Sequence, residues 1–194
     1  MLETKVVLEG ITIGGKTLRE HLEVVNHREA IFFVEDIVKN NETLTEWQIR
    51  SLHKLILKGI NDEYAGNYRD QKVIISGAQH FPPEPFLIKE QMEELISWYQ
   101  NDGALLHSVE KAALLHIIFV GIHPFIDGNG RTSRLLLNLE LMKSGYPAVV
   151  IRTENRFKYY SALDKAHVNG NNADFIELIC DELNNSLDLY LKLL

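Results

Sequence analysis

The chain has 194 residues, of which 45% are hydrophobic and 24% are charged, and this balance is typical of one globular domain over residues 1–194. Asp and Glu number 27 against 20 Lys and Arg, and the formal net charge of −7 argues against nucleic acid as a partner. The single cysteine, Cys180, excludes an internal disulfide and a cysteine-rich zinc site. No apolar run approaches the about 18 residues of a membrane span. A cytoplasmic protein without a membrane segment is therefore expected.

The first half of the chain is predicted to contain two helices and a hairpin. Apolar residues recur at helical spacing between Thr17 and Val38. The capping box Thr43-Leu44-Thr45-Glu46 begins a second helix, which Gly59 is expected to end. Residues 67–81 differ, because three β-branched residues stand between turn formers and predict a short β-hairpin. The three are Val73, Ile74 and Ile75.

The second half of the chain is predicted to be helical. His123-Pro124 ends its most apolar helix, because the residue before a proline is disfavoured in the α region. Gly145 is expected to stop the next one. Strands do not alternate regularly with helices, which argues against a parallel sheet, so the predicted fold class is all-α with a small β-hairpin. The helical patterns cover residues 88–99, 108–122, 135–142, 156–166 and 174–191.

Residues 10–17 match the phosphate-loop pattern GxxxxGK(S/T), in which backbone N–H groups cradle phosphates. In such a loop Lys16 would reach a phosphate and Thr17 would reach Mg²⁺. The pattern needs a buried strand before it and a parallel sheet around it, but residues 5–8 make a weak strand and no sheet is predicted. A phosphate-loop NTPase is therefore an alternative function, and the simpler interpretation is a turn in which Thr17 caps a helix.

A second candidate phosphate site lies at residues 123–134, HPFIDGNGRTSR. Gly128 and Gly130 allow a tight turn and a close approach to a ligand. The helix that begins there presents unpaired N–H groups and the positive end of its dipole, both of which suit an anion. Arg131 and Arg134 share one face of that helix. Two cations at a helix N-terminus oppose the dipole, and bound phosphates would offset this cost.

Two neighbouring residues add chemistry to this anion site. Asp127 offers a hard oxygen ligand suited to Mg²⁺, and His123 titrates near neutral pH and can accept a proton. An EF-hand is excluded, because Arg131 stands at the fifth loop position, where an oxygen ligand is needed. A zinc site lacks a third ligand, since His116 is expected inside an apolar helix. A plain turn would explain the glycines but not the charged residues that converge on them.

The stretch 123–134 matches the Fic family signature HPFx(D/E)GNGRxxR at every defined position, so the chain resembles this family. The resemblance extends over nearly the whole chain and implies an all-α Fic fold, with the motif in a loop between two core helices. It also implies transfer of AMP from ATP to a hydroxyl side chain (Ser, Thr or Tyr) of a target protein, with self-modification. Other stretches that look like Fic landmarks are residues 20–27, Tyr68-Arg69, Pro82-Pro83, 135–147 and 159–163.

The resemblance implies a role for each motif residue. His123 would be the general base that deprotonates the incoming hydroxyl, and Phe125 would anchor the loop in the core. Asp127 would hold Mg²⁺ against the α- and β-phosphates. Related Doc kinases have Lys where this chain has Gly130, and glycine favours AMP transfer over phosphoryl transfer. The anion hole and the contacts with the β- and γ-phosphates fall on Gly128, Asn129, Gly130, Arg131 and Arg134.

Two further regions carry the resemblance beyond the motif. Tyr159 and Tyr160 look like the family's nucleotide-pocket tyrosines, with packing in the core as the alternative for Tyr159. His167 stands where some relatives have Asn near adenine. A flap would hold the target segment beside the site through backbone hydrogen bonds, which make little demand on sequence. Its residues are Val73, Ile74, Ile75, Ser76 and Gly77.

Many Fic proteins are silenced by a helix of pattern (S/T)xxxE(G/N), whose Glu pairs with the second motif arginine, here Arg134. Glu9-Gly10 comes closest, but Lys5 occupies the Ser/Thr position, and no other segment fits. We therefore expect Arg134 to be available to the γ-phosphate. Inhibition would then come from an upstream helix that has been removed or from a separate antitoxin. A homodimer is also compatible with the sequence. A Fic domain that removes AMP or only binds nucleotide is a further alternative, because the same His and Asp would serve both directions.

Overall fold

The computed structural model describes residues 2–10 and 12–192, and all regular structure in these residues is helical. The predicted all-α fold is therefore confirmed. None of the helices described is long and apolar enough to cross a membrane. The α-helices are α1 (Leu2–Leu8), α2 (Leu18–Lys39), α3 (Glu46–Leu57), α4 (Ile88–Gln100), α5 (Ser108–Ile122), α6 (Asn129–Lys143), α7 (Arg156–Asn169) and α8 (Ala173–Leu191).

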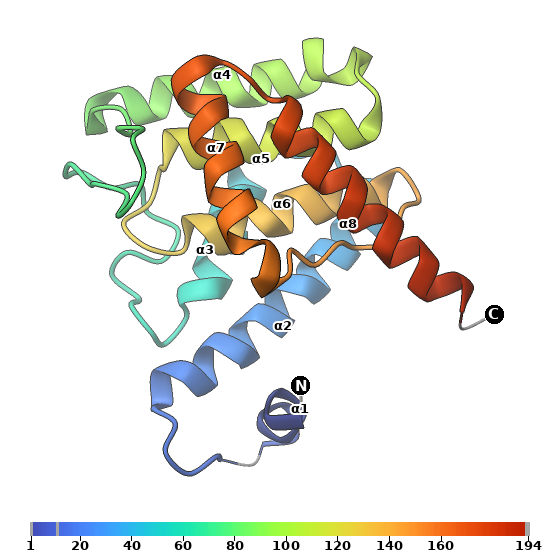
Figure 1. Ribbon diagram of the computed structural model, residues 1–194. Coiled ribbons are helices and arrows are strands. Elements are labelled where there is room, and N and C mark those ends of the chain that lie inside the picture. Colours follow the sequence, from blue (N-terminus) through green and yellow to red (C-terminus); the bar gives the residue numbers. More distant parts are fainter. Residues whose placement is uncertain (1, 11, 193–194) are drawn as a thin grey trace.

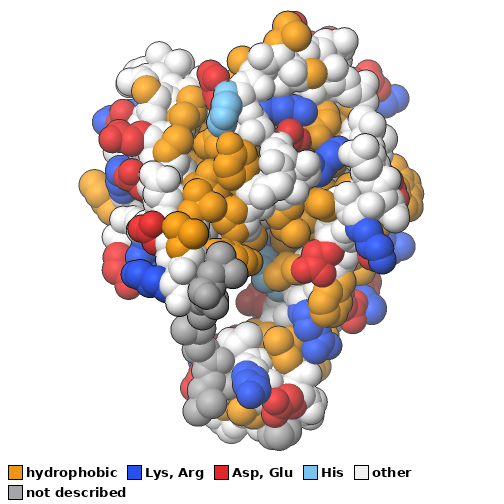
Figure 2. Space-filling model, turned by 90° about the vertical axis from the view of Figure 1, so that its right-hand side faces the viewer, with side chains coloured by type: hydrophobic (Ala, Val, Ile, Leu, Met, Phe, Trp, Pro, Cys, Tyr) orange, Lys and Arg blue, Asp and Glu red, His pale blue; other side chains and the backbone are white. Residues whose placement is uncertain are grey.

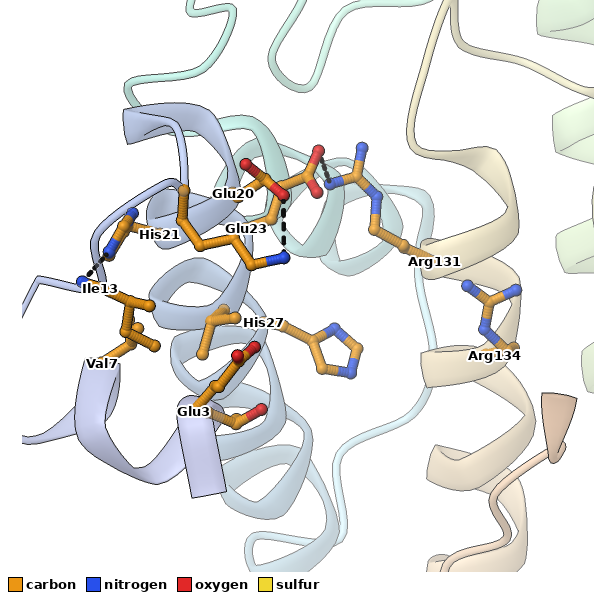
Figure 3. A pocket seen from close by; sticks show the side chains of 12 residues that line it. Glu3, Val7, Ile13, Glu20, His21, Glu23, His27, Arg131 and Arg134 are labelled. Carbon is orange, nitrogen blue, oxygen red and sulfur yellow. Dashed lines mark hydrogen bonds and ion pairs between the residues drawn. The ribbon is translucent and has the colours of Figure 1, made fainter. Parts of the chain in front are cut away.

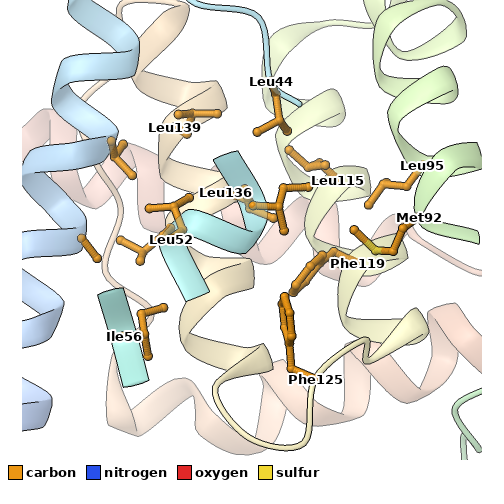
Figure 4. Close-up of a cluster of buried hydrophobic side chains, with 14 of the residues drawn as sticks. Leu44, Leu52, Ile56, Met92, Leu95, Leu115, Phe119, Phe125, Leu136 and Leu139 are labelled. Atoms are coloured by element: carbon orange, nitrogen blue, oxygen red, sulfur yellow. The ribbon is translucent and has the colours of Figure 1, made fainter. Parts of the chain in front are cut away.

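Helices α5 and α6 form the centre of the molecule, and α2, α3, α4, α7 and α8 pack around them, whereas α1 packs on α2 (Figure 1). α5 is apolar on all sides, and such a helix is stable only when neighbours cover it. One apolar cluster joins α5 and α6 to α2, α3 and α4, with Leu52, Phe119 and Leu136 among its buried members (Figure 4). A second cluster joins them to α7 and α8. The loop that carries the motif 123–134 connects this central pair.

Threonine caps begin α2 and α3. Thr17 accepts a hydrogen bond from the Glu20 N–H, and the Glu20 carboxylate accepts one from the Thr17 N–H, at 3.2 and 2.8 Å. The predicted box over residues 43–46 is wrong by two positions. Thr45 is the cap of α3, because Gln48 lies where its side-chain oxygen can accept the Thr45 N–H at 2.7 Å.

The predicted β-hairpin over residues 67–81 does not form a strand in the structure. A turn does form at Ser76 and Gly77, where the Ala78 N–H donates to the Ile75 carbonyl at 3.1 Å. The backbone N–H groups of the two arms bond to other parts of the chain and form no strand ladder within the described residues. Arg69 and Gln79 each donate a backbone N–H, to the Pro124 carbonyl and the Asp164 carboxylate respectively.

Residues 10–17 do not build a phosphate loop, although Ile11 itself lies outside the described residues. Helix α1 precedes the segment where a strand would be needed, and no strand exists in residues 2–10 or 12–192 to form a sheet around it. The Lys16 ammonium lies 3.5 Å from Glu20, and the Thr17 hydroxyl caps α2. The phosphate-loop NTPase alternative is therefore wrong, and the interpretation of Thr17 as a helix cap is confirmed.

Candidate active site

His123 ends α5 in an unusual backbone conformation. Its φ and ψ are 50° and 56°, in the left-handed region that a non-glycine residue seldom adopts. Its ring Nδ1 is buried without a hydrogen-bond partner among the described residues. The sequence suggested that His123 titrates near neutral pH, but burial lowers its pKa to about 4, so the ring is neutral at physiological pH. A neutral imidazole can accept a proton, as a general base must.

The motif loop is anchored from within by Phe125 and Asn129. Phe125 is fully buried beside Phe119, as expected (Figure 4). The Asn129 amide nitrogen donates to the Phe125 carbonyl at 2.7 Å, and its oxygen accepts the Phe125 N–H at 3.0 Å. Because the Asn129 side chain is buried and bonded to the loop through both its nitrogen and its oxygen, it holds the loop, and the backbone N–H of Asn129 is the donor expected to face a ligand.

His53 of α3 supports the same loop from beneath. Its ring stacks on Phe125 with 3.6 Å between centroids. Nδ1 accepts the Gly66 N–H at 2.9 Å, so Nε2 carries the proton and donates to the Asp127 carbonyl at 2.8 Å. A Cβ at Gly128, where φ is +83°, would lie 3.0 Å from this Nε2. Glycine is therefore required at 128 both for the backbone conformation and for space.

Arg131 and Arg134 project from the first turns of α6 toward α2 and α1 (Figure 3). They line a cavity of about 500 Å³ together with Glu3, His21 and His27, among others. In the space-filling view the molecule is hollowed above its lowest lobe, with charged side chains around the hollow (Figure 2). Arg131 pairs with Glu23 at 3.5 Å. Arg134 forms no ion pair with any described residue, and Glu9 is exposed.

Asp127 is an ionised carboxylate held by three donors. It accepts the Gly128 N–H at 2.6 Å and lies 2.8 Å from Arg19 and 3.3 Å from Arg131. Burial alone would raise the pKa of Asp127, but Arg131, the Gly128 N–H and Arg19 outweigh it and lower the pKa. The described residues contain no group of three or more metal-ligating side chains. One carboxylate nevertheless fits Mg²⁺, which commonly binds to one or two carboxylates with substrate phosphates and water.

The residues expected near adenine differ in their surroundings, although the rings of Tyr159 and Tyr160 are in contact. Tyr159 is buried, and its hydroxyl meets His116 Nε2 at 2.9 Å, so it packs in the core. His116 is itself fully buried, as expected. Tyr160 is 52% exposed and lies 5.1 Å from Tyr159, edge to face. His167 donates from Nε2 to the Ile117 carbonyl at 2.9 Å.

The flap has a near arm, residues 67–72, and a far arm, residues 78–81, on either side of its tip. The far arm is fixed to α7 and α5. His80 packs on His167 with 4.5 Å between ring centroids and donates from Nε2 to the Gly121 carbonyl at 2.9 Å. The Gln79 N–H is 3.1 Å from the Asp164 carboxylate. Between these anchors and the near arm, Ile74 is 80% exposed. The expected flap residues 73–77 therefore lie between two arms that are anchored near the end of α5 and to α7, with Ile74 exposed.

Several supporting residues had no sequence signal that marked them for this site. The sequence marks Tyr68-Arg69 and the stretch 20–27 only as Fic landmarks without a role, and no pattern in it points to His53, Arg19 or Asp164. Each is a lone polar residue within an ordinary helical or loop segment. Only the Arg19 and Glu23 pair, spaced as i and i+4, had a pattern that could have predicted a contact on α2.

Comparisons with known proteins agree with this arrangement. The Fic/DOC family model matches residues 43–141. Protein adenylyltransferase Fic from Nematostella vectensis is 37% identical over 97% of this chain, and the Aedes aegypti protein of the same name is 37% identical over 98%. This chain spans only 44% and 38% of those two relatives.

Solved structures of related proteins share the fold. Fic-1 from C. elegans superposes with a TM-score of 0.89 at 30% identity, over 97% of this chain and 56% of that one. A Fic domain containing signaling protein from Bacteroides thetaiotaomicron superposes with a TM-score of 0.87 at 31% identity, over 98% of this chain and 78% of that one. With the motif at every defined position and the fold around it in place, the chain belongs to the Fic/DOC family.

Proposed function

We propose that this chain is a protein adenylyltransferase, which transfers AMP from ATP to a hydroxyl side chain of a target protein and to itself. The observation that supports it most is the juxtaposition of the neutral His123, at the end of α5, with the basic N-terminal turns of α6. Glycine at 130, where Doc kinases have lysine, favours AMP transfer. The relatives named protein adenylyltransferase Fic agree with this assignment.

The phosphates would bind at the start of α6. The backbone N–H groups of Gly128, Asn129 and Gly130 would surround the α-phosphate, and Arg131 and Arg134 would bind the β- and γ-phosphates. His53 and the Asn129 amide fix this turn before any ligand arrives. Donors that are fixed in advance stabilise the charge that develops in the transition state without a cost of reorganisation.

Asp127 would hold Mg²⁺ together with phosphate oxygens of ATP. When bound, Mg²⁺ would neutralise charge on the phosphates and on the departing pyrophosphate. Arg19 now lies 2.8 Å from Asp127 and would have to move aside. Since Arg19 is largely exposed, its side chain has room to do so.

The acceptor proton would pass to His123. Because Nδ1 is enclosed, Nε2 is the nitrogen that can meet an incoming hydroxyl. The hydroxyl oxygen would bond to the α-phosphorus, its proton would go to Nε2, and the bond from the α-phosphorus to the bridging oxygen would break and release pyrophosphate. The flap tip, residues 73–77, would hold the acceptor segment there by backbone hydrogen bonds. Adenine contacts of Tyr159, Tyr160 and His167 stay predictions.

Labelled ATP tests this function. The chain is incubated with Mg²⁺, a cell lysate and ATP labelled at either the α- or the γ-phosphate. Label retained on protein from the α position supports adenylyl transfer, and label from the γ position alone would indicate a kinase. Removal of AMP from a modified protein, without any transfer from ATP, would indicate the reverse activity. No change in any protein would leave only nucleotide binding.

A further inference from the structure

Arg69 is a buried cation whose partners are all backbone carbonyls. Its exposure is 2%, and it forms no ion pair with any residue of the ranges described. Nε donates to the His123 carbonyl at 2.8 Å, Nη1 to the Gln71 carbonyl at 3.0 Å and Nη2 to the Pro83 carbonyl at 2.7 Å. The geometry uses the planar fork of a guanidinium, which a lysine cannot reproduce.

These carbonyls belong to the end of α5 and to the segment around the flap, which must be aligned for the proposed base to meet the acceptor. His123 ends α5, where the last carbonyls lack partners within the helix and carry the negative end of its dipole, so a cation is stabilised there. Gln71 precedes the flap tip, and Pro83 lies just after the flap segment 67–81, so the two residues stand on either side of the tip. One side chain therefore joins the proposed base to the segment proposed to hold the acceptor.

The backbone of residue 69 strengthens the same link. Its N–H donates to the Pro124 carbonyl at 2.9 Å, so Arg69 is hydrogen-bonded to the carbonyls of both His123 and Pro124. His123 is left-handed there, with φ 50°, a conformation that persists only when its surroundings enforce it. Arg69 provides two of the contacts that do so.

We propose that Arg69 is a positioning residue that fixes His123 and the flap relative to each other. Its role in catalysis rests on the adenylyltransferase function proposed above. Phosphate binding should not depend on it, because the turn at the start of α6 is held separately by His53 and Asn129. Asp164 provides a matched control, since it holds only the far arm of the flap, through the Gln79 N–H.

The test compares Arg69→Lys, Arg69→Gln and Asp164→Ala in the full chain. The 13Cα chemical shift of His123 reports its backbone conformation, and amide hydrogen exchange over residues 71–80 reports the flap. We expect both Arg69 variants to move the His123 shift toward ordinary helical or extended values and to speed flap exchange. Asp164→Ala should speed flap exchange alone. Arg69→Lys keeps the charge and is expected to fold if Arg69→Gln does not.

Kinetics then connect this geometry to catalysis. The self-labelling rate at saturating ATP should fall about 10- to 100-fold in Arg69→Lys, as expected for a misplaced base, while the Kd of ATP stays unchanged. An unchanged His123 shift in Arg69→Lys, or a loss of thermal stability without a change in shift and flap exchange, would overturn the proposal. Absence of self-labelling in the unmodified chain would instead count against the proposed function, and the two structural measurements would still decide the role of Arg69.

Discussion

His53 donates a hydrogen bond of 2.8 Å from Nε2 to the backbone carbonyl of Asp127, so a side chain of α3 fixes the residue proposed to hold Mg²⁺. The same ring stacks on Phe125 and accepts the Gly66 N–H. α3 is therefore part of the site, although it contains no residue of the motif.

His53→Phe should weaken both the fold and ATP binding. The variant keeps an aromatic ring against Phe125 but leaves the Gly66 N–H and the Asp127 carbonyl without their partner. Because the Gly66 N–H is buried, we expect the free energy of unfolding to fall by about 1–3 kcal/mol, measured by urea denaturation. His53→Gln can still donate and accept, and should recover part of this loss. Equal losses in the two variants would show that the hydrogen bonds are not what His53 contributes.

Gly128→Ala should destabilise the chain more than Gly145→Ala does. Both glycines have positive φ, +83° and +81°, but a Cβ at 128 would crowd His53, whereas one at 145 would meet nothing within 4 Å. Gly145→Ala thus measures the backbone cost alone, about 1–2 kcal/mol. The difference between the two free energies of unfolding measures the crowding, and the absence of a difference would contradict the close approach to His53.

Acid should destabilise the fold through its buried histidines. Burial lowers the pKa of His53 and His123 to about 4 and that of His116 to about 3, from an ordinary 6.5. Below pH 6.5 these rings take up protons in the unfolded chain but resist them in the folded one. The free energy of unfolding should therefore fall as the pH drops from 6.5 toward 4, by at most about 1.4 kcal/mol per pH unit for each ring. Urea denaturation across this range checks it, and His53→Phe should make the slope shallower.

Arg19→Gln should lower the Mg²⁺ concentration that gives half-maximal self-labelling, because Arg19 now occupies the Asp127 carboxylate. Lys16→Gln is the control, since Lys16 pairs with Glu20 and not with Asp127. Lys16→Gln should leave both the Mg²⁺ dependence of self-labelling and the binding of ATP unchanged. If Arg19→Gln needs the same Mg²⁺ concentration for half-maximal self-labelling as the unmodified chain, Arg19 and Mg²⁺ do not compete for Asp127.

The motif could be predicted from the sequence because its residues are contiguous. The spacing of Arg131 and Arg134 alone places them on one helix face, and the His123-Pro124 pair alone ends α5. Helical periodicity likewise predicted α2, since the spacing of apolar residues along the chain is a local property, although Leu18 and Ile31 of that pattern are exposed. The cap of α3 was misplaced because two overlapping threonine patterns compete, and only the position of Gln48 decides between them.

The supports of the loop could not be predicted in this way. His53 and Arg69 act across 74 and 54 residues of chain, and both bind backbone carbonyls, which every sequence provides. The hairpin was wrong for a related reason. Residues 73–75 favour strands, but their flanks bond to Pro124 and Asp164, so no strand partner is left.

The most direct test of adenylyl transfer is the fate of α-labelled ATP in His123→Ala beside the unmodified chain. We expect the unmodified chain to retain the label on protein, and the variant to do so about 10²–10⁴ times more slowly, because the general base is lost. The Kd of ATP should be unchanged, since His123 lies at the end of α5 and the phosphates are proposed to bind at the start of α6. Undiminished labelling by His123→Ala, or retention of label from the γ position alone, would contradict the proposed function.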